Sequence, residues 1–204
     1  TTVRANLFAP LSLIYSPQSC EKLMAAKAKL YQLKITLTDS SPVIWRRINV
    51  PSTITLDLLH EIIQTAMGWQ NQHMYAFDHE EASFGEVFPE DNNGMYPSDK
   101  VKLNELLTTV RDKLTYIYDM GDNWEHVVVL EKILPSDNSK PTCTHASGAC
   151  PPEDCGGIGG YYHLREVLKN PQDPEYQAMT KWLGGKFDPN FVDTATINKK
   201  LSAL

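Results

Sequence analysis

Residues 31–37, YQLKITL, alternate apolar and polar side chains without interruption. Because successive side chains of a strand point to opposite faces, this period of two predicts a strand with one buried face. Residues 39–42, Asp-Ser-Ser-Pro, then supply turn chemistry, and residues 43–50 form a second apolar segment that ends at Pro51. The sequence therefore predicts an antiparallel hairpin near the start of the fold.

A helix is expected to cover this hairpin. Residues 55–67 carry apolar side chains three and four positions apart, Thr55 is a preferred capping residue, and Gly68 follows the last apolar position. A short helical turn is predicted at residues 102–107. Alternating segments return at residues 73–79, 114–118 and 126–130. This order predicts an α+β fold with a mixed or antiparallel β-grasp-like sheet and one covering helix.

The end of the chain is expected to form a C-terminal helical cap. Helices are predicted at residues 160–168, 175–183 and from Thr194 onward, because Gly or Pro interrupts the pattern between them. Residues 1–29 show no clean period and are interpreted as an N-terminal appendage that is partly helical. We therefore predict one α+β domain over residues 30–190, followed by a tail helix at 191–204.

Composition and charge narrow the classes of partner. The chain has 19 Lys and Arg against 25 Asp and Glu, a net charge of −6, which gives no overall reason to bind a phosphate backbone and disfavours nucleic acid. No apolar run approaches the roughly 20 residues of a membrane-spanning helix. Four cysteines are too few for a disulfide scaffold, and three of them fall within residues 143–155, so we expect a cytoplasmic protein with one thiol cluster.

Several longer strings follow one another in a specific order. They are VIWRRI at 43–48, LLHEIIQ at 58–64 followed by MGW at 67–69, YDMGDNWEH at 118–126, CPPEDCGG at 150–157 and WLGGKFDP at 182–189. Together they resemble the plasmid pRiA4b ORF-3-like family, whose members also occur as passenger proteins of mobile elements. The resemblance implies an α+β domain without an established activity. Met120 departs from it, because an aromatic residue is expected at that position of the turn.

Three cysteines and a histidine fall within residues 135–155, which are predicted to form a polar loop. Thiolates and imidazoles are the ligands that Zn²⁺ binds tetrahedrally, although the spacing here is looser than in paired C-x2-C zinc sites. The candidate ligands are Cys143, His145, Cys150 and Cys155. The segment is therefore either a structural zinc site or a loop held by its own turns, and zinc is the one cofactor that the sequence indicates.

Charged residues gather around the predicted turn at residues 119–126. Asp119, Asp122, Glu125 and His126 can bind a divalent cation or position a water molecule for general base catalysis. The same carboxylates are also ordinary turn chemistry, because they accept hydrogen bonds from backbone amides. His126 and Asp122 are the candidate catalytic groups, with Glu153 as the alternative base.

If these residues form a site, we expect it where the turn meets His73 and residues 150–157. The predicted binding residues are His73, Asp119, Asp122, His126, Glu153 and Asp154. A separate candidate is Arg46-Arg47, which follows Trp45 in the second strand. Arginine grips phosphate or carboxylate with two donors and tryptophan stacks on a base, but we favour salt bridges to the acidic turn.

Direct DNA binding is disfavoured by the net charge of −6, although the Arg46-Arg47 pair keeps it open as a third alternative, and two classes of function come before it. The first is a non-catalytic interaction module that binds a protein or peptide through an exposed sheet edge or an acidic surface. The second is a metal-dependent enzyme, a hydrolase or nuclease accessory, with a His/Asp/Glu site. The sequence favours the first, because acidic turns and capped glycine segments arise for folding reasons more often than for chemistry.

Overall fold

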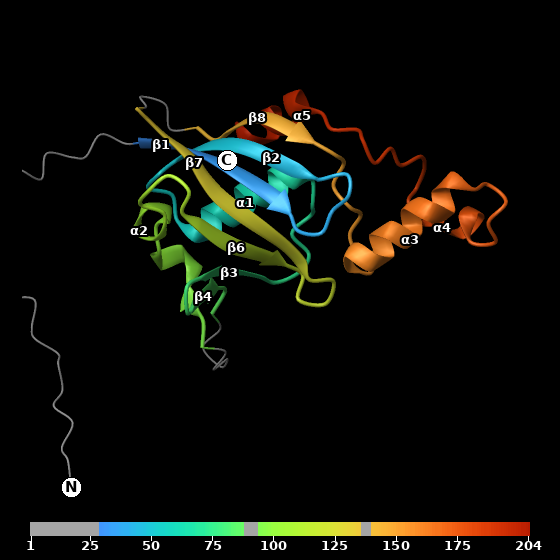
Figure 1. The fold of residues 1–204 in the computed structure, drawn as a ribbon, viewed down its shortest axis with the longest axis horizontal. Helices are drawn as coiled ribbons and strands as arrows, with labels where there is room; N and C mark the ends of the chain where they lie inside the picture. The colour runs from blue at the N-terminus through green and yellow to red at the C-terminus, as the bar shows by residue number, and fades with distance from the viewer. Residues whose placement is uncertain (1–28, 88–93, 136–139) are drawn as a thin grey trace, which may run out of the picture.

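The fold is built on one large mixed sheet. The computed structural model describes residues 29–87, 94–135 and 140–204, so nearly all of the predicted N-terminal appendage lies outside the described residues. The strands are β1 (Lys29–Leu37), β2 (Trp45–Pro51), β3 (Tyr75–His79), β4 (Ala82–Gly85), β5 (Tyr96–Pro97), β6 (Lys113–Tyr118), β7 (Trp124–Pro135) and β8 (Thr142–Ser147). They form an 8-stranded sheet in the order β5-β4-β3-β6-β7-β1-β2-β8, and every neighbouring pair is antiparallel except β4 and β5 (Figure 1).

The helices lie on one face of the sheet and at its ends. They are α1 (Leu56–Met67), α2 (Leu103–Leu106), α3 (Gly157–Lys169), α4 (Tyr176–Trp182) and α5 (Thr194–Leu201), with a 3-10 turn η1 (Ser98–Lys100). Figure 1 shows α1 running behind β1 and β2, whereas α3 and α4 project away from the sheet. No helix in the described ranges is both long and apolar enough to cross a membrane.

The predicted hairpin and its covering helix are confirmed. β1 pairs antiparallel with β2, and the apolar side chains of β1 are buried in one core with those of α1. Gly68 ends α1 in the left-handed conformation (φ 114°), where its N–H donates to the carbonyl of Gln64. Glycine adopts this conformation without the steric cost that a Cβ brings, so the residue that predicted the end of the helix also forms it.

The predicted β-grasp-like sheet with one covering helix is wrong, because the sheet is much larger. The strands β4, β5 and β8 were not expected, and β8 lies inside the segment that was predicted to be a polar loop. In β8 the side chain of Cys143 is buried while its neighbours Thr142 and Thr144 are not. β8 lies at the edge of the sheet and contributes one small buried side chain. Its sequence therefore lacks the alternation of apolar and polar residues that predicts a strand.

The tail helix α5 is part of the core. Its Ile197 and Leu201 are buried with the residues of α1. Its Asn198 binds the outer edge of β8, because the side-chain Nδ2 donates to the carbonyl of Cys143 (2.9 Å) and the N–H of Cys143 donates to Oδ1 (2.7 Å). The backbone of β8 is therefore partly satisfied on the side that no described strand covers.

Candidate metal centre

A short loop follows α1 and carries His73. Three successive backbone amides of this loop are each bound by the side chain of another element. The N–H groups of Gln70, Asn71 and Gln72 donate to Glu153 Oε1 (2.7 Å), Gln64 Oε1 (2.9 Å) and Tyr118 Oη (3.0 Å). A loop held at three consecutive residues has little freedom, so the position of His73 is fixed by the fold.

A buried polar network around His60 also holds this loop in place. His60 on α1 is stacked on Tyr75 and lies 2.8 Å from both Tyr116 Oη and Asn71 Oδ1. Gln64 Nε2 donates to Tyr116 Oη, so the Tyr116 hydroxyl donates its own proton to His60 Nδ1, and His60 Nε2–H donates to Asn71. Burial lowers the pKa of His60 to about 4, which keeps the ring neutral as this arrangement requires.

Asp119 begins the turn between β6 and β7. Its backbone is in the left-handed region (φ 57°), and its Oδ1 accepts hydrogen bonds from the N–H groups of Gly121 (2.9 Å) and Asp122 (3.3 Å). The other oxygen, Oδ2, lies 3.6 Å from Nε2 of His73. One oxygen of this carboxylate therefore builds the turn while the second faces the histidine.

Asp154 comes from the glycine-rich segment that leads into α3. The preceding residue, Glu153, accepts a hydrogen bond from the hydroxyl of Tyr118 (3.1 Å). Burial and the nearby Glu153 carboxylate raise the pKa of Tyr118, so this hydroxyl keeps its proton and donates. Asp154 itself has φ 55°, and its Oδ1 lies 3.0 Å from Nε2 of His73.

The glycines let this segment approach the turn closely. Gly156, the N-cap residue of α3, donates its N–H to Asp122 Oδ2 (3.1 Å). A Cβ on Gly157 would overlap the carbonyl group of Asp122, and Gly157 also has φ 65°. Backbone contact therefore requires glycine at position 157, and likewise at 160, where a Cβ would overlap the carbonyl group of Cys155.

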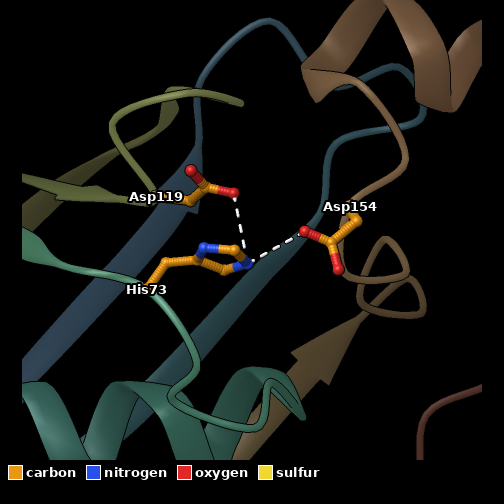
Figure 2. Close-up of side chains that lie close together, drawn as sticks. All are labelled: His73, Asp119 and Asp154. Atoms are coloured by element: carbon orange, nitrogen blue, oxygen red, sulfur yellow. Dashed lines mark ion pairs between the residues drawn. The ribbon is translucent and has the colours of Figure 1, made fainter.

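His73, Asp119 and Asp154 form a compact group of potential ligands (Figure 2). One ligand atom of each lies within 4.8 Å of the other two, and within the described ranges no other three or more His, Cys, Asp or Glu residues meet this test. Nε2 of His73 is shielded from solvent but forms no hydrogen bond of good geometry with a described residue. Its contacts are the ion pairs with Asp154 (3.0 Å) and Asp119 (3.6 Å), and an ion bound between the three side chains would replace them.

The three side chains differ in exposure, and the group is open to solvent on the side of Asp154. The exposed fraction is 10% for Asp119, 29% for His73 and 61% for Asp154. One imidazole nitrogen and two carboxylate oxygens suit borderline and hard divalent ions such as Zn²⁺, Fe²⁺ and Mn²⁺. Three protein ligands leave coordination positions for water, as in catalytic rather than structural zinc sites.

The four predicted zinc ligands do not form a comparable group. Cys143 points into the core from β8, and its Sγ contacts the carbonyl of His145, whose own side chain is exposed. Cys150 and Cys155 lie in the segment before α3, and burial raises the pKa of both thiols. The geometry therefore lends no support to this ligand set, and zinc binding there stays a prediction.

His126, a predicted catalytic residue, lies in the core and is not a member of this group. Its side chain is fully buried, Nδ1 lies 3.3 Å from the carbonyl of Tyr116, and Nε2 has no hydrogen-bond partner in the described part of the chain. Burial lowers its pKa to about 4. Asp122 lines a separate cleft of about 160 Å³ between the β1–β2 turn and the start of α3, and His73 does not line that cleft.

The two arginines point to opposite faces of the sheet, and neither binds the acidic turn. Arg46 is buried and donates to backbone carbonyls, including Ala66 (2.7 Å) at the C-terminal end of α1 and Ser147 (3.0 Å) in β8. Arg47 forms a bidentate salt bridge with Glu131 of β7 (2.5 and 2.9 Å). The predicted salt bridges to the 119–126 turn are absent from the described structure.

Sequence reasoning missed the supporting residues His60, Gln64 and Tyr118. A signal was present for two of them, because His60 and Gln64 follow Leu56 and Leu59 at helical spacing and therefore fall on the buried side of α1. Polar side chains at such positions need partners, and their partners hold the His73 loop.

The mixed sheet, its single-sided helical cover and the His–Asp–Asp group together define an α+β protein with a candidate metal centre at one end of the sheet. The chain belongs to the family of plasmid pRiA4b ORF-3-like proteins, whose family model matches residues 29–196. This confirms the resemblance of the sequence strings.

Two relatives match this chain along most of their length. An uncharacterized protein, y4hQ, of Sinorhizobium fredii (strain NBRC 101917 / NGR234) is 36% identical over 183 residues, which are 87% of this chain and 93% of that protein. The crystal structure of MM3350, a protein of unknown function from Methanosarcina mazei Go1, superposes with a TM-score of 0.76 at 36% identity and covers 82% of this chain and 97% of its own. The fold is therefore shared, and neither relative carries an activity in its description.

Proposed function

We propose that this protein binds a divalent metal ion through His73, Asp119 and Asp154 and presents it at an open coordination site. The observation that carries the proposal is the convergence of three ligand atoms, from three separate segments, within 4.8 Å of one another. The supporting hydrogen bonds of the His73 loop add preorganisation, which a metal site needs for affinity.

The chemistry that such an ion supplies is activation of water. A divalent ion with three protein ligands lowers the pKa of a bound water molecule toward neutrality and so provides a hydroxide nucleophile. Zinc is the first ion to test, and Mn²⁺ the second, because the donor set holds one nitrogen and two oxygens. The proposed class is a metal-dependent hydrolase, and the free thiols of Cys143, Cys150 and Cys155 favour a cytoplasmic location.

The protein-interaction module is the second candidate, through a surface other than the β8 edge. Asn198 already binds the backbone of that edge, which leaves less of it for an added peptide strand. The projecting α3–α4 arm is the better surface, because α4 buries none of its residues. Trp182, the last residue of α4, and Phe191, which follows the helix, are 51% and 66% exposed.

Isothermal titration of the purified, chelator-treated protein with Zn²⁺ and Mn²⁺ tests the metal proposal. We expect one site, and we expect His73→Ala and Asp154→Asn each to weaken it by at least about tenfold, since even residues that only orient ligands cost 10–100-fold in affinity. His163→Ala is the matched control, because His163 is an exposed histidine that contacts Glu175 and lies outside the group. Saturating metal should also raise the melting temperature of the wild type and the control.

Two results would contradict the proposal. One is a wild-type protein that binds neither ion, and the other is a His73→Ala variant that binds as tightly as the His163→Ala control. Trp182→Ser belongs to the interaction surface, so it should leave metal affinity unchanged and keep the two candidates separable.

A further inference from the structure

The sheet has an outer face that none of the described helices covers. The inward side chains of β1, such as Leu33 and Ile35, are buried, whereas Lys34 and Thr36 between them are partly exposed. In Figure 1 the strands β7, β1 and β2 face the viewer, with α1 behind them. The outer face is therefore a surface of the molecule built from regularly spaced strand positions.

Strand register places basic residues in line across this face. Lys113 pairs with Val129, Val129 with Lys34, Lys34 with Arg47, and Arg47 with His145. These positions belong to five adjacent strands, about 4.8 Å apart at each step. We call the line of Lys113, Lys34, Arg47 and His145 the basic row.

The basic row is locally positive in a protein whose net charge is −6. Lys132, which pairs with Gln32 beside the bulge in β7, adds a further cation. Glu131 at the same bulge binds Arg47, and Arg47, Lys34 and Lys132 all lower the pKa of Glu131. Lys34, Arg47, Lys113 and Lys132 thus outnumber this carboxylate by three.

Two further carboxylates of this face lie outside the basic row, Asp78 in the next row and Glu125 one row farther. Asp78 and Glu125 face the same side but lie on rows nearer the 119–126 turn, because Asp78 pairs with Thr115 and Glu125 with Ile117. Apart from Glu131, the carboxylates named here lie toward the 119–126 turn and the cations toward the opposite ends of the strands. The average charge of the chain hides this separation.

An aromatic ring stands directly beside the basic row. Trp45 is half-buried on β2 and pairs with Thr36, one row away from Lys34 and Arg47. The ammonium of Lys34 and the guanidinium of Arg47 lie 5.2 and 5.1 Å from its ring centroid. Cations in line with an aromatic ring on an open sheet are the combination by which proteins bind single strands of nucleic acid.

We propose that the outer face binds single-stranded nucleic acid, with phosphates along the basic row and a base against Trp45. This inference stands apart from the metal proposal, since the two use different residues. The expectation against nucleic acid rested on the net charge, which is an average over the chain, whereas phosphate contacts depend on local charge.

Fluorescence anisotropy with a labelled oligothymidylate of about twelve nucleotides tests this proposal on the full chain at about 50 mM salt. We expect Lys34→Gln/Lys113→Gln to weaken binding at least about tenfold and to make the slope of log affinity against log salt shallower by about 1.4. Trp45→Leu should weaken binding about tenfold without changing that slope, because stacking releases no counterions.

Lys181→Gln/Lys186→Gln is the matched control, because it removes the same charge from exposed lysines outside the outer face. It should bind like the wild type, and all variants should keep the wild-type melting temperature within a few degrees. Three results would overturn the proposal: no binding by the wild type, equal weakening in the control, or competition by polyglutamate as strong as by unlabelled oligonucleotide, which would assign the face to acidic proteins.

Discussion

Arg46 and Arg47 are adjacent in the sequence, yet they belong to different regions of the molecule. Arg46 lies on the inner face of the sheet, is buried and is surrounded by backbone carbonyls. Arg47 lies on the outer face, with 26% of its side chain exposed and one carboxylate partner. The inner arginine connects α1 to β2 and β8, so it serves the fold, whereas the outer one pairs with Glu131 on the surface of the sheet. The residue type alone therefore does not determine what an arginine of β2 does, because its role depends on which face of the sheet its side chain lies on.

The largest effect is expected from Arg46→Met. This change removes the donors to the carbonyls of Ala66, Met67 and Ser147, two of which lie at the negative end of the α1 dipole. Buried acceptors left without donors cost about 1–3 kcal/mol each, partly offset by the lost desolvation of the charge, so we expect a loss of about 4 kcal/mol. Urea denaturation at pH 7 measures it. An unchanged or increased stability would mean that the inner arginine contributes no more than the outer one.

A smaller effect is expected from pH on the inner face. Burial lowers the pKa of His126 from 6.5 to about 4, so between these values the unfolded state binds a proton that the folded state does not. Stability is therefore highest above pH 6.5 and falls as the pH drops toward 4, by up to roughly 3 kcal/mol for this residue.

His126→Phe provides the test of that pH dependence, because it removes the titrating group from the core. Denaturation midpoints at pH 7, 6 and 5 should fall less steeply in the variant than in the wild type, while His60, whose pKa burial also lowers to about 4, still contributes. Parallel curves for variant and wild type would show that His126 is not held neutral by burial.

The smallest effect is expected from Arg47→Met on the outer face. Partly exposed salt bridges contribute about 0–1 kcal/mol, since water and salt screen both charges, so stability should change by less than about 1 kcal/mol. The same denaturation assay as for Arg46→Met gives the direct comparison. A loss as large as that of Arg46→Met would show that Arg47 also holds the fold together.

The sequence predicted those elements of the fold whose buried side chains are large. β1 was found because Tyr31, Leu33 and Ile35 alternate with polar residues, and α1 because its apolar positions recur at helical spacing. β4 and β8 were missed because they are short or bury little, and without them the sheet was taken for a β-grasp. Pairing between distant strands, such as β2 with β8, leaves no periodic trace in the sequence.

The site was harder to predict than the fold. From the sequence, His73, Asp119 and Asp154 were among the predicted binding residues. The predicted catalytic group, however, was His126, which lies in the core. The alternation in β7 separates His126 from Val127, yet both sets of positions carry apolar side chains, so the pattern does not tell which set faces inward. Only the pairing of β7 with β1 and β6 decides that.

The contact between Asn198 and β8 also bears on aggregation through the edge of the sheet. An edge strand with free N–H and C=O groups is a template on which a second copy can add its own strand, and such additions lead to aggregates. Here one amide side chain occupies both backbone groups of Cys143, so the tail helix shields the edge as a bound peptide would. Deletion of residues 194–201 is therefore expected to cause precipitation, because other chains would pair with the exposed edge of β8.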